Sequence, residues 1–145
     1  MFEGRRACGG SLEPLNKKAV ILPTRKSVFV VDDDPSMLAS LKRLLRAHGF
    51  DVLGFGSANE LLGYGQFARA ACVVLDIDLD GQSGIDLHRK LLTMGVTAPV
   101  IYITGNDTRA NRLSAIALDC VACLTKPFAA QALIESVERA CAGVT

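Results

Sequence analysis

The chain has 145 residues, half of them hydrophobic, and a formal net charge of +1 at pH 7. This length is typical of one domain, and the near-zero charge gives no general attraction to nucleic acid or to acidic membranes. No apolar run approaches the roughly 18 residues of a membrane-spanning helix, and no N-terminal segment has the apolar core of a secretory signal. We therefore expect a cytoplasmic protein whose five cysteines are reduced.

The charge is unevenly distributed along the chain. Residues 1–26 carry six Lys and Arg against two acidic residues, whereas residues 27–145 carry ten against thirteen. The first segment also contains Gly9-Gly10 and Pro14 and shows no sustained hydrophobic periodicity. We predict a flexible basic tail over residues 1–26 and a single domain over residues 27–145.

The regular pattern begins with a strand and a helix. Residues 28–31 form a continuous β-branched and aromatic run, as expected of a strand buried on both faces. Asp33 or Asp34 can cap the helix that follows, Pro35 suits its first turn, and Gly49 can end it. The helix has one apolar stripe, formed by Met37, Leu38, Leu41, Leu44 and Leu45.

The same alternation continues to the end of the chain. Residues 50–55 predict a second strand, and Ser57 with Glu60 has the spacing of a capping box that opens a short helix. Three more strands are expected at residues 72–75, 100–103 and 121–124. Three more helices are marked by the apolar stripes Ile85, Leu87, Leu91 and Leu92; Leu113, Ile116 and Ala117; and Leu133, Ile134, Val137 and Cys141.

Five strands that alternate with five helices predict an α/β fold, a doubly wound parallel sheet with helices on both faces. Such sheets place their functional sites beyond the carboxyl ends of the strands. Polar residues follow the predicted strands at that edge: Asp32, Asp33 and Asp34; Asp76, Asp78 and Asp80; Thr104; and Lys126. The sequence therefore predicts a site of carboxylates, one hydroxyl and one ammonium group.

This set of groups suits phosphoryl transfer. Carboxylates held close together repel one another unless they protonate, pair with a cation or bind metal. Their oxygen ligands favour Mg²⁺ or Mn²⁺ over zinc. A carboxylate such as Asp76 can attack phosphorus, while Lys126 and the Thr104 hydroxyl stabilise the phosphoryl oxygens. Gly105 leaves the approach to the site open.

Five segments in this order resemble the receiver domain of two-component response regulators. They are residues 28–34, 73–76, 81–84, 100–105 and 124–128, and the resemblance covers about residues 27–142. It implies a single-domain, flavodoxin-like receiver with five parallel strands in the order 2-1-3-4-5.

The resemblance implies a role for each acidic residue of the site. Asp76 would be the phosphoacceptor, and it would bind Mg²⁺ or Mn²⁺ together with Asp33 and the backbone carbonyl of Asp78. Asp32 would belong to the same pocket and act partly through metal-bound water. The chain would then be a switch with slow autodephosphorylation at most, rather than an enzyme.

The remaining positions of the family motif concern the phosphoryl group and the signal. Thr104, Gly105 and Lys126 would contact the phosphoryl group, and Pro127 would be a cis-proline that aims Lys126 into the site. Thr104 would move toward the new charge. Cys123 stands where the family usually has an aromatic residue that swings with the threonine, so a ring-flip readout is not expected.

The sequence departs from the family pattern, or varies within it, at other positions too. Asp80 replaces a common proline after the phosphoacceptor, and Asp119 stands where a helix-ending glycine is frequent. Asp tolerates the left-handed conformation better than most residues. Asp78 and Asn106 occupy positions that tune the lifetime of the phosphoryl group in this family.

The implied partners are a sensor histidine kinase or phosphotransfer protein and a downstream protein of unknown identity, and the chain could also form a homodimer. Only seventeen residues follow Phe128, so no DNA-binding domain is expected. We expect output through the last two helices and the fifth strand, and charge reversal at Arg109 or Arg112 to perturb partner binding without affecting phosphorylation.

Two other functions compete with this one. A pseudo-receiver would keep the fold as a binding module without phosphorylation, and Cys123 is its best support. The run from Asp76 to Gly81 also resembles the first motif of haloacid-dehalogenase-type phosphatases, with Asp78 as general acid/base. That family places its second acidic motif after the lysine, however, whereas Asp32 and Asp33 precede the nucleophile here.

Overall fold

The computed structural model describes residues 26–142. The predicted basic tail, residues 1–26, lies outside the described residues except for Lys26. In chain order the elements are β1 (Ser27–Val31), α1 (Pro35–Ala47), β2 (Val52–Phe55), α2 (Ala58–Tyr64), a 3₁₀ turn (Phe67–Arg69), β3 (Ala70–Asp76), β4 (Asp78–Leu79), β5 (Gln82–Ser83), α3 (Gly84–Thr93), β6 (Val100–Thr104), α4 (Arg109–Ala117), β7 (Ala122–Thr125) and α5 (Ala130–Cys141).

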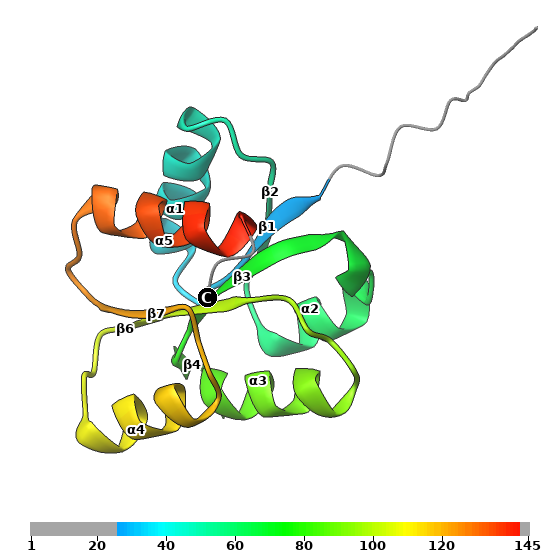
Figure 1. Cartoon of the computed structure of the whole chain (residues 1–145), viewed down its shortest axis with the longest axis vertical. Coiled ribbons are helices and arrows are strands. Elements are labelled where there is room, and N and C mark those ends of the chain that lie inside the picture. Colours follow the sequence, from blue (N-terminus) through cyan, green and yellow to red (C-terminus); the bar gives the residue numbers. More distant parts are fainter. Residues whose placement is uncertain (1–25, 143–145) are drawn as a thin grey trace, which may run out of the picture.

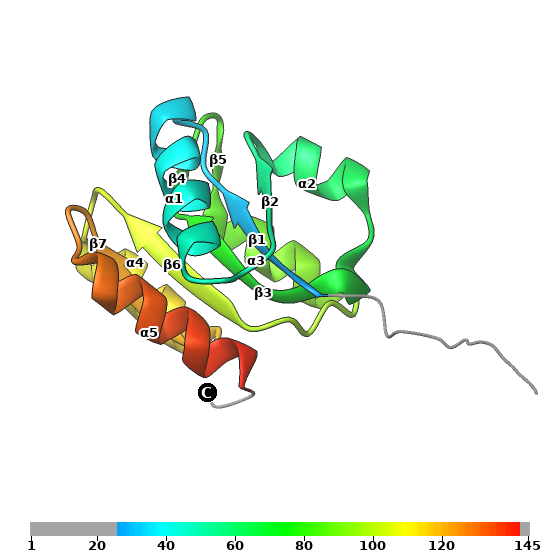
Figure 2. The same ribbon diagram turned by 90° about the horizontal axis from the view of Figure 1, so that it is seen from above.

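The centre of the molecule is a five-stranded parallel sheet in the order β2-β1-β3-β6-β7. In terms of the five predicted strands this is the order 2-1-3-4-5, so the predicted doubly wound fold is confirmed. Helices α1 and α5 cover one face of the sheet, and α2, α3 and α4 cover the other (Figures 1 and 2). The three middle strands, β1, β3 and β6, are almost wholly buried because helices cover both faces of the sheet. Strands in this position are apolar on both sides.

Local sequence signals set the helix ends. The Asp34 carboxylate accepts hydrogen bonds from the backbone N–H groups of Ser36 and Met37, and Pro35 occupies the first turn of α1. Ser57 caps α2 by accepting from the Glu60 N–H. These caps fix where α1 and α2 begin. They therefore also fix the position of the loop residues between each helix and the strand before it.

The structure corrects the predicted apolar stripe of α4. Leu113 and Ile116 are 55% and 66% exposed, and α4 reaches the core through Ala115. The stripe prediction was also wrong for Leu92, which is 43% exposed on α3. An apolar residue at helical spacing is buried only where the neighbouring element covers that part of the helix.

Further differences lie at strand ends and in the segment after β3. Strand β2 begins at Val52 rather than at residue 50. The two-residue strands β4 and β5, which pair antiparallel directly after β3, were not predicted from the sequence.

None of the helices that the structure describes is both long and apolar enough to cross a membrane.

Candidate phosphoacceptor site

Three neighbouring strands carry polar residues to one edge of the sheet. Asp32 follows β1 directly, Asp76 is the last residue of β3, and Thr104 is the last residue of β6. The exposed fractions of these residues are 0%, 3% and 1%. Parallel pairing of β1 with β3 and of β3 with β6 holds them side by side. The edge predicted from the chain order is thus where these polar groups meet.

The acidic residues form a compact cluster. Carboxylate oxygens of Asp32, Asp33 and Asp76 all lie within 4.8 Å of one another. Asp32 and Asp76 are buried, whereas Asp33 is more accessible to solvent. Three carboxylates at this separation need a counter-charge, because their mutual repulsion disfavours simultaneous ionisation.

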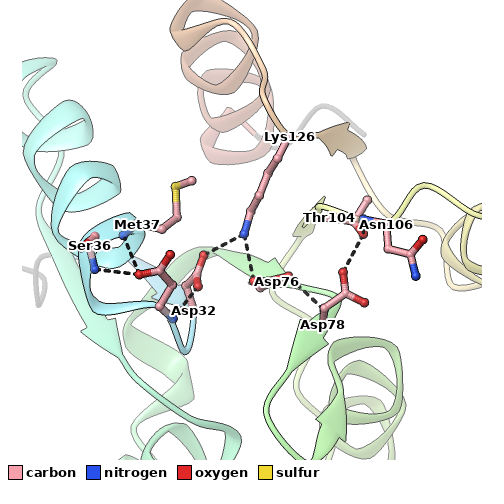
Figure 3. A network of polar contacts seen from close by, with 9 residues as sticks. Asp32, Ser36, Met37, Asp76, Asp78, Thr104, Asn106 and Lys126 are labelled. Carbon is pink, nitrogen blue, oxygen red and sulfur yellow. Dashed lines mark hydrogen bonds and ion pairs between the residues drawn. The ribbon is translucent and has the colours of Figure 1, made fainter.

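Lys126 supplies one positive charge to this cluster. Its Nζ donates to Asp76 Oδ2 at 3.1 Å and to Asp32 Oδ2 at 3.4 Å (Figure 3). The lysine follows β7, whose backbone is anchored to β6 by the hydrogen bond from Lys126 N to Thr104 O. The peptide bond between Lys126 and Pro127 is cis.

Burial and neighbouring charges have opposing effects on the pKa values of Asp32 and Lys126. Burial raises the pKa of the Asp32 carboxyl, and the charge of Asp76 adds to the rise, while the Asp34 N–H and Lys126 oppose it. Burial also disfavours the Lys126 ammonium, but its hydrogen bond to Asp76 and the attraction of both carboxylates outweigh this cost, so its pKa is raised. The ammonium therefore remains charged at neutral pH.

A cation with oxygen ligands fits this donor set. The carboxylates of Asp32, Asp33 and Asp76 are the three groups within reach of one ion, and Mg²⁺ and Mn²⁺ prefer such oxygens. Asp33 is the member of the set with access to solvent, which leaves room for metal-bound water.

Thr104 lies on the other side of Asp76 and contacts Asp78 instead of Lys126. The Thr104 hydroxyl donates to Asp78 Oδ2 at 3.0 Å and accepts from the Asn106 N–H at 2.9 Å (Figure 3). The Asp78 N–H in turn donates to Asp76 Oδ1 at 2.9 Å. Asp76, Asp78, Thr104 and Lys126 were all predicted at this edge from the sequence. The hydrogen bond between Thr104 and Asp78 was not predicted.

Gly84 is a site residue whose role the sequence did not reveal. A Cβ atom at this position would lie 2.1 Å from the carbonyl oxygen of Asp76. The Gly84 N–H also donates to the carbonyl of Ile77 at 2.7 Å. The start of α3 therefore packs directly against the backbone that carries the phosphoacceptor candidate, and only glycine permits this approach.

The predicted switch position Cys123 lies on β7 opposite Tyr102 of β6. Cys123 is partly buried and packs against the cluster that contains Tyr102. The Tyr102 hydroxyl is in hydrogen-bond contact with His88 Nδ1 of α3, and both residues are buried. His88 is thus a buried residue of the packing between α3 and the sheet, and burial lowers its pKa.

The remaining predicted residues lie around the same edge. Gly105 follows β6, and a Cβ there would only reach ordinary contact, 4.0 Å, with the Lys126 side chain. Asp80 is exposed in the turn between β4 and β5. Asp119 has a φ of 59°, the left-handed conformation expected of a residue at a glycine position.

The comparisons with known proteins agree with this geometry. The family model for the response regulator receiver domain matches residues 28–138. Nodulation protein W of Bradyrhizobium diazoefficiens is 40% identical over 114 residues, which cover 79% of this chain and 50% of that protein. The response regulator protein TodT of Pseudomonas putida is 29% identical over 140 residues, which cover 97% of this chain and 59% of TodT.

Solved structures give the same result. The structure of FixJ-N has a TM-score of 0.75 and 30% identity, with 83% of this chain and 96% of that chain covered. The response regulator StyR has a TM-score of 0.76 and 34% identity, with 81% and 60% covered. The chain spans 50% to 59% of the length of nodulation protein W and TodT. On its sequence, fold and site, the chain belongs to the response regulator receiver family.

Proposed function

We propose that the chain is a phosphorylatable switch of a two-component system, in which Asp76 accepts a phosphoryl group from a phosphohistidine on a sensor kinase or phosphotransfer protein. The observation that carries this proposal is the position of Asp76. Its carboxylate lies at the carboxyl end of β3, within the acidic cluster and 3.1 Å from the Lys126 ammonium.

In the proposed step, a carboxylate oxygen of Asp76 attacks phosphorus and forms an acyl phosphate. The bond between phosphorus and the donor's histidine nitrogen breaks, and that nitrogen leaves with the electron pair. Lys126 stays beside the transferred group and neutralises one of its oxygens, since its ammonium is held within the site by Asp32. The Thr104 hydroxyl donates to Asp78 Oδ2 in the unmodified protein, and it would donate to a second phosphoryl oxygen after leaving Asp78.

Mg²⁺, or Mn²⁺, completes the proposed site. Asp33 and Asp76 would hold it through carboxylate oxygens, with the Asp78 carbonyl, and with Asp32 partly through water. When bound, the ion supplies positive charge to the phosphoryl oxygens. The fit rests on the three carboxylates within 4.8 Å and on the solvent access of Asp33.

The output is proposed to pass by contact with another protein, or with a second copy of the chain, on the surface formed by α4, β7 and α5. Leu113 and Ile116 of α4 expose apolar surface there, and Arg109 and Arg112 line a groove together with Leu113. A phosphohistidine donor and free Mg²⁺ are both found in the cytoplasm, where we expect this domain to act.

Two alternatives make different predictions for the same site. A pseudo-receiver would bind a partner without forming an acyl phosphate, and Cys123 at the usual aromatic position supports it. A haloacid-dehalogenase-type phosphatase would hydrolyse small phosphate esters rapidly, with Asp78 as general acid/base. We propose instead a phosphoacceptor that loses its phosphoryl group slowly and is not an enzyme.

The proposal is tested by intact-protein mass spectrometry after incubation with acetyl phosphate, with and without Mg²⁺. We expect one phosphoryl group to be added in the presence of Mg²⁺ and none in Asp76→Asn. If the wild type gains no mass although it binds Mg²⁺, the pseudo-receiver is favoured. Rapid release of phosphate from a small ester would favour the phosphatase.

A further inference from the structure

The hydroxyl of Thr104 is fully engaged in the described structure. It donates its proton to Asp78 Oδ2 at 3.0 Å and accepts the Asn106 N–H at 2.9 Å. A hydroxyl has one proton to donate. Thr104 therefore cannot donate to a phosphoryl oxygen on Asp76 until it gives up Asp78.

We propose that Asp78 is a positioning residue that holds the Thr104 hydroxyl away from the phosphoryl site in the unmodified protein and releases it when Asp76 is phosphorylated. This inference rests on the proposed function, because it assigns a role to Asp78 in the switching of that site. It makes the side chain of Asp78, rather than a swinging aromatic ring, the partner of the threonine.

The geometry links the release to charge. The Asp78 N–H donates to Asp76 Oδ1 at 2.9 Å, so the two residues are held next to each other at the end of β3 (Figure 3). A phosphoryl group on Asp76 carries about two negative charges near neutral pH. Repulsion between these charges and the Asp78 carboxylate weakens the hold on Thr104 at the moment when a stronger acceptor forms beside it.

The surroundings of Asp78 allow it to move. Asp78 is exposed, whereas Asp76 and Thr104 are buried. Together with Asp33 and Asn106, it lines a groove of about 520 Å³ that is open to solvent. The carboxylate can therefore turn into water without leaving a buried charge unpaired. Thr104 is buried, and its only described acceptor on this side is Asp78.

Two substitutions separate the hydrogen bond from the charge. Asp78→Ala removes both the charge and the acceptor, whereas Asp78→Asn removes the charge but keeps an amide oxygen that Thr104 can bind. Asp80→Ala is the matched control, since Asp80 is an exposed acidic residue of the same loop. If only the charge of Asp78 matters, Asp78→Ala and Asp78→Asn change the Thr104 rotamer and the beryllofluoride affinity equally.

The first measurement is made on the unmodified protein, without any phosphoryl mimic. Three-bond couplings to the Thr104 methyl group report its χ1 rotamer by NMR. We expect one dominant rotamer in the wild type, Asp78→Asn and Asp80→Ala, and averaging between rotamers in Asp78→Ala. Unchanged methyl signals of the buried Leu133 and Val137 would show that the fold is intact. A single wild-type rotamer in Asp78→Ala overturns the proposal.

The second measurement is the affinity for beryllofluoride with Mg²⁺. We expect Asp78→Ala to bind about fivefold more tightly than Asp78→Asn, a ratio that corresponds to one hydrogen bond of roughly 1 kcal/mol. Equal affinities in the two variants contradict the proposal. Failure of the wild type to bind beryllofluoride would instead contradict the phosphoacceptor function, and the rotamer measurement would still decide the role of Asp78.

Discussion

The two sides of the site differ in how their functional groups are held. On the β1–β3 side, Asp32 and Asp76 are buried, lie at strand ends and share the Lys126 ammonium. On the β6–β7 side, Thr104 is held by the exposed Asp78, and the strand beyond it carries Cys123. On the first side buried carboxylates are paired with an ammonium group, and the second side depends on one exposed side chain.

This difference indicates which side performs which task. Groups fixed by strand ends and buried neighbours are suited to the proposed phosphoryl transfer, because they need no rearrangement before it. A hydroxyl that donates its proton to one exposed carboxylate is suited to signalling, because a new charge can shift its equilibrium between two acceptors.

The tightest packing on the β1–β3 side is at Gly84, and Gly84→Ala should be the most damaging change. Its Cβ would lie 2.1 Å from the Asp76 carbonyl oxygen, so the backbone must shift. We expect a loss of about 3 kcal/mol in the free energy of unfolding, measured by urea denaturation.

The matched control is Gly63→Ala, on the exposed surface of α2, where a Cβ meets nothing within 4 Å. That change should stabilise the protein by about 0.5 kcal/mol, because alanine favours the helix. If Gly84→Ala were equally harmless, the backbone at Asp76 and the start of α3 could move apart at little cost.

Lys126 should stabilise the same side through charge. Lys126→Met leaves the Asp32 and Asp76 carboxylates without their ammonium partner, and we expect a loss of about 2 kcal/mol in metal-free buffer. Adding Mg²⁺ should raise the melting temperature more in this variant than in the wild type, because the cation replaces the missing charge.

Thermal denaturation with and without Mg²⁺ measures both effects. Lys90→Met, at an exposed position of α3, is the control and should behave like the wild type. An equal response to Mg²⁺ in wild type and Lys126→Met would show that the metal and the lysine do not share the acidic cluster.

On the β6 side, the buried pair of His88 and Tyr102 should make stability depend on pH. Burial lowers the folded-state pKa of His88 below its ordinary value of 6.5. The unfolded chain therefore binds the proton more readily, and the unfolding free energy falls as pH drops from 6.5 toward the folded-state pKa.

Urea denaturation between pH 7.5 and pH 5 tests this slope, which for one proton is at most about 1.4 kcal/mol per pH unit. The slope should decrease in His88→Gln but not in His48→Gln, because His48 lies on the exposed end of α1. An identical slope in His88→Gln would remove His88 as its source.

The smallest effect is expected at Asp119, before β7. Its φ of 59° lies in the region that glycine adopts without cost. Asp119→Gly should stabilise the protein by a few tenths of a kcal/mol, and Asp119→Ala should destabilise it by about 0.5 kcal/mol, because alanine fits this conformation poorly. The difference in urea midpoint between these two variants is the measurement, and a midpoint equal in both would show that this turn relaxes.

The fold and the edge that carries the site could be predicted because they follow from chain order. Buried strands alternate with amphipathic helices, and the polar residues after residues 31, 75 and 103 necessarily meet when the strands are parallel and adjacent. The Ser57 cap was also predicted, and the first cap was narrowed to Asp33 or Asp34, of which the structure has Asp34, since capping depends on residues close in sequence.

The rest depends on tertiary packing that one sequence does not encode locally. The hydrogen bond from Thr104 to Asp78 requires particular rotamers of residues 26 positions apart. The burial of His88 against Tyr102 depends on how α3 lies on the sheet. The exposure of Leu113 and Ile116 depends on how little of α4 the neighbouring elements cover. The role of Gly84 appears only when the Asp76 carbonyl is placed beside it.

The central claim is that Asp76 itself accepts the phosphoryl group. The most direct test is to treat the protein with acetyl phosphate and Mg²⁺, reduce the acyl phosphate with borohydride, and sequence the peptides by mass spectrometry. Reduction converts a phosphorylated aspartate to homoserine. We predict homoserine at position 76 and none at positions 32, 33 or 78. Homoserine at one of those three positions, or none anywhere after Mg²⁺-dependent treatment, would contradict the claim.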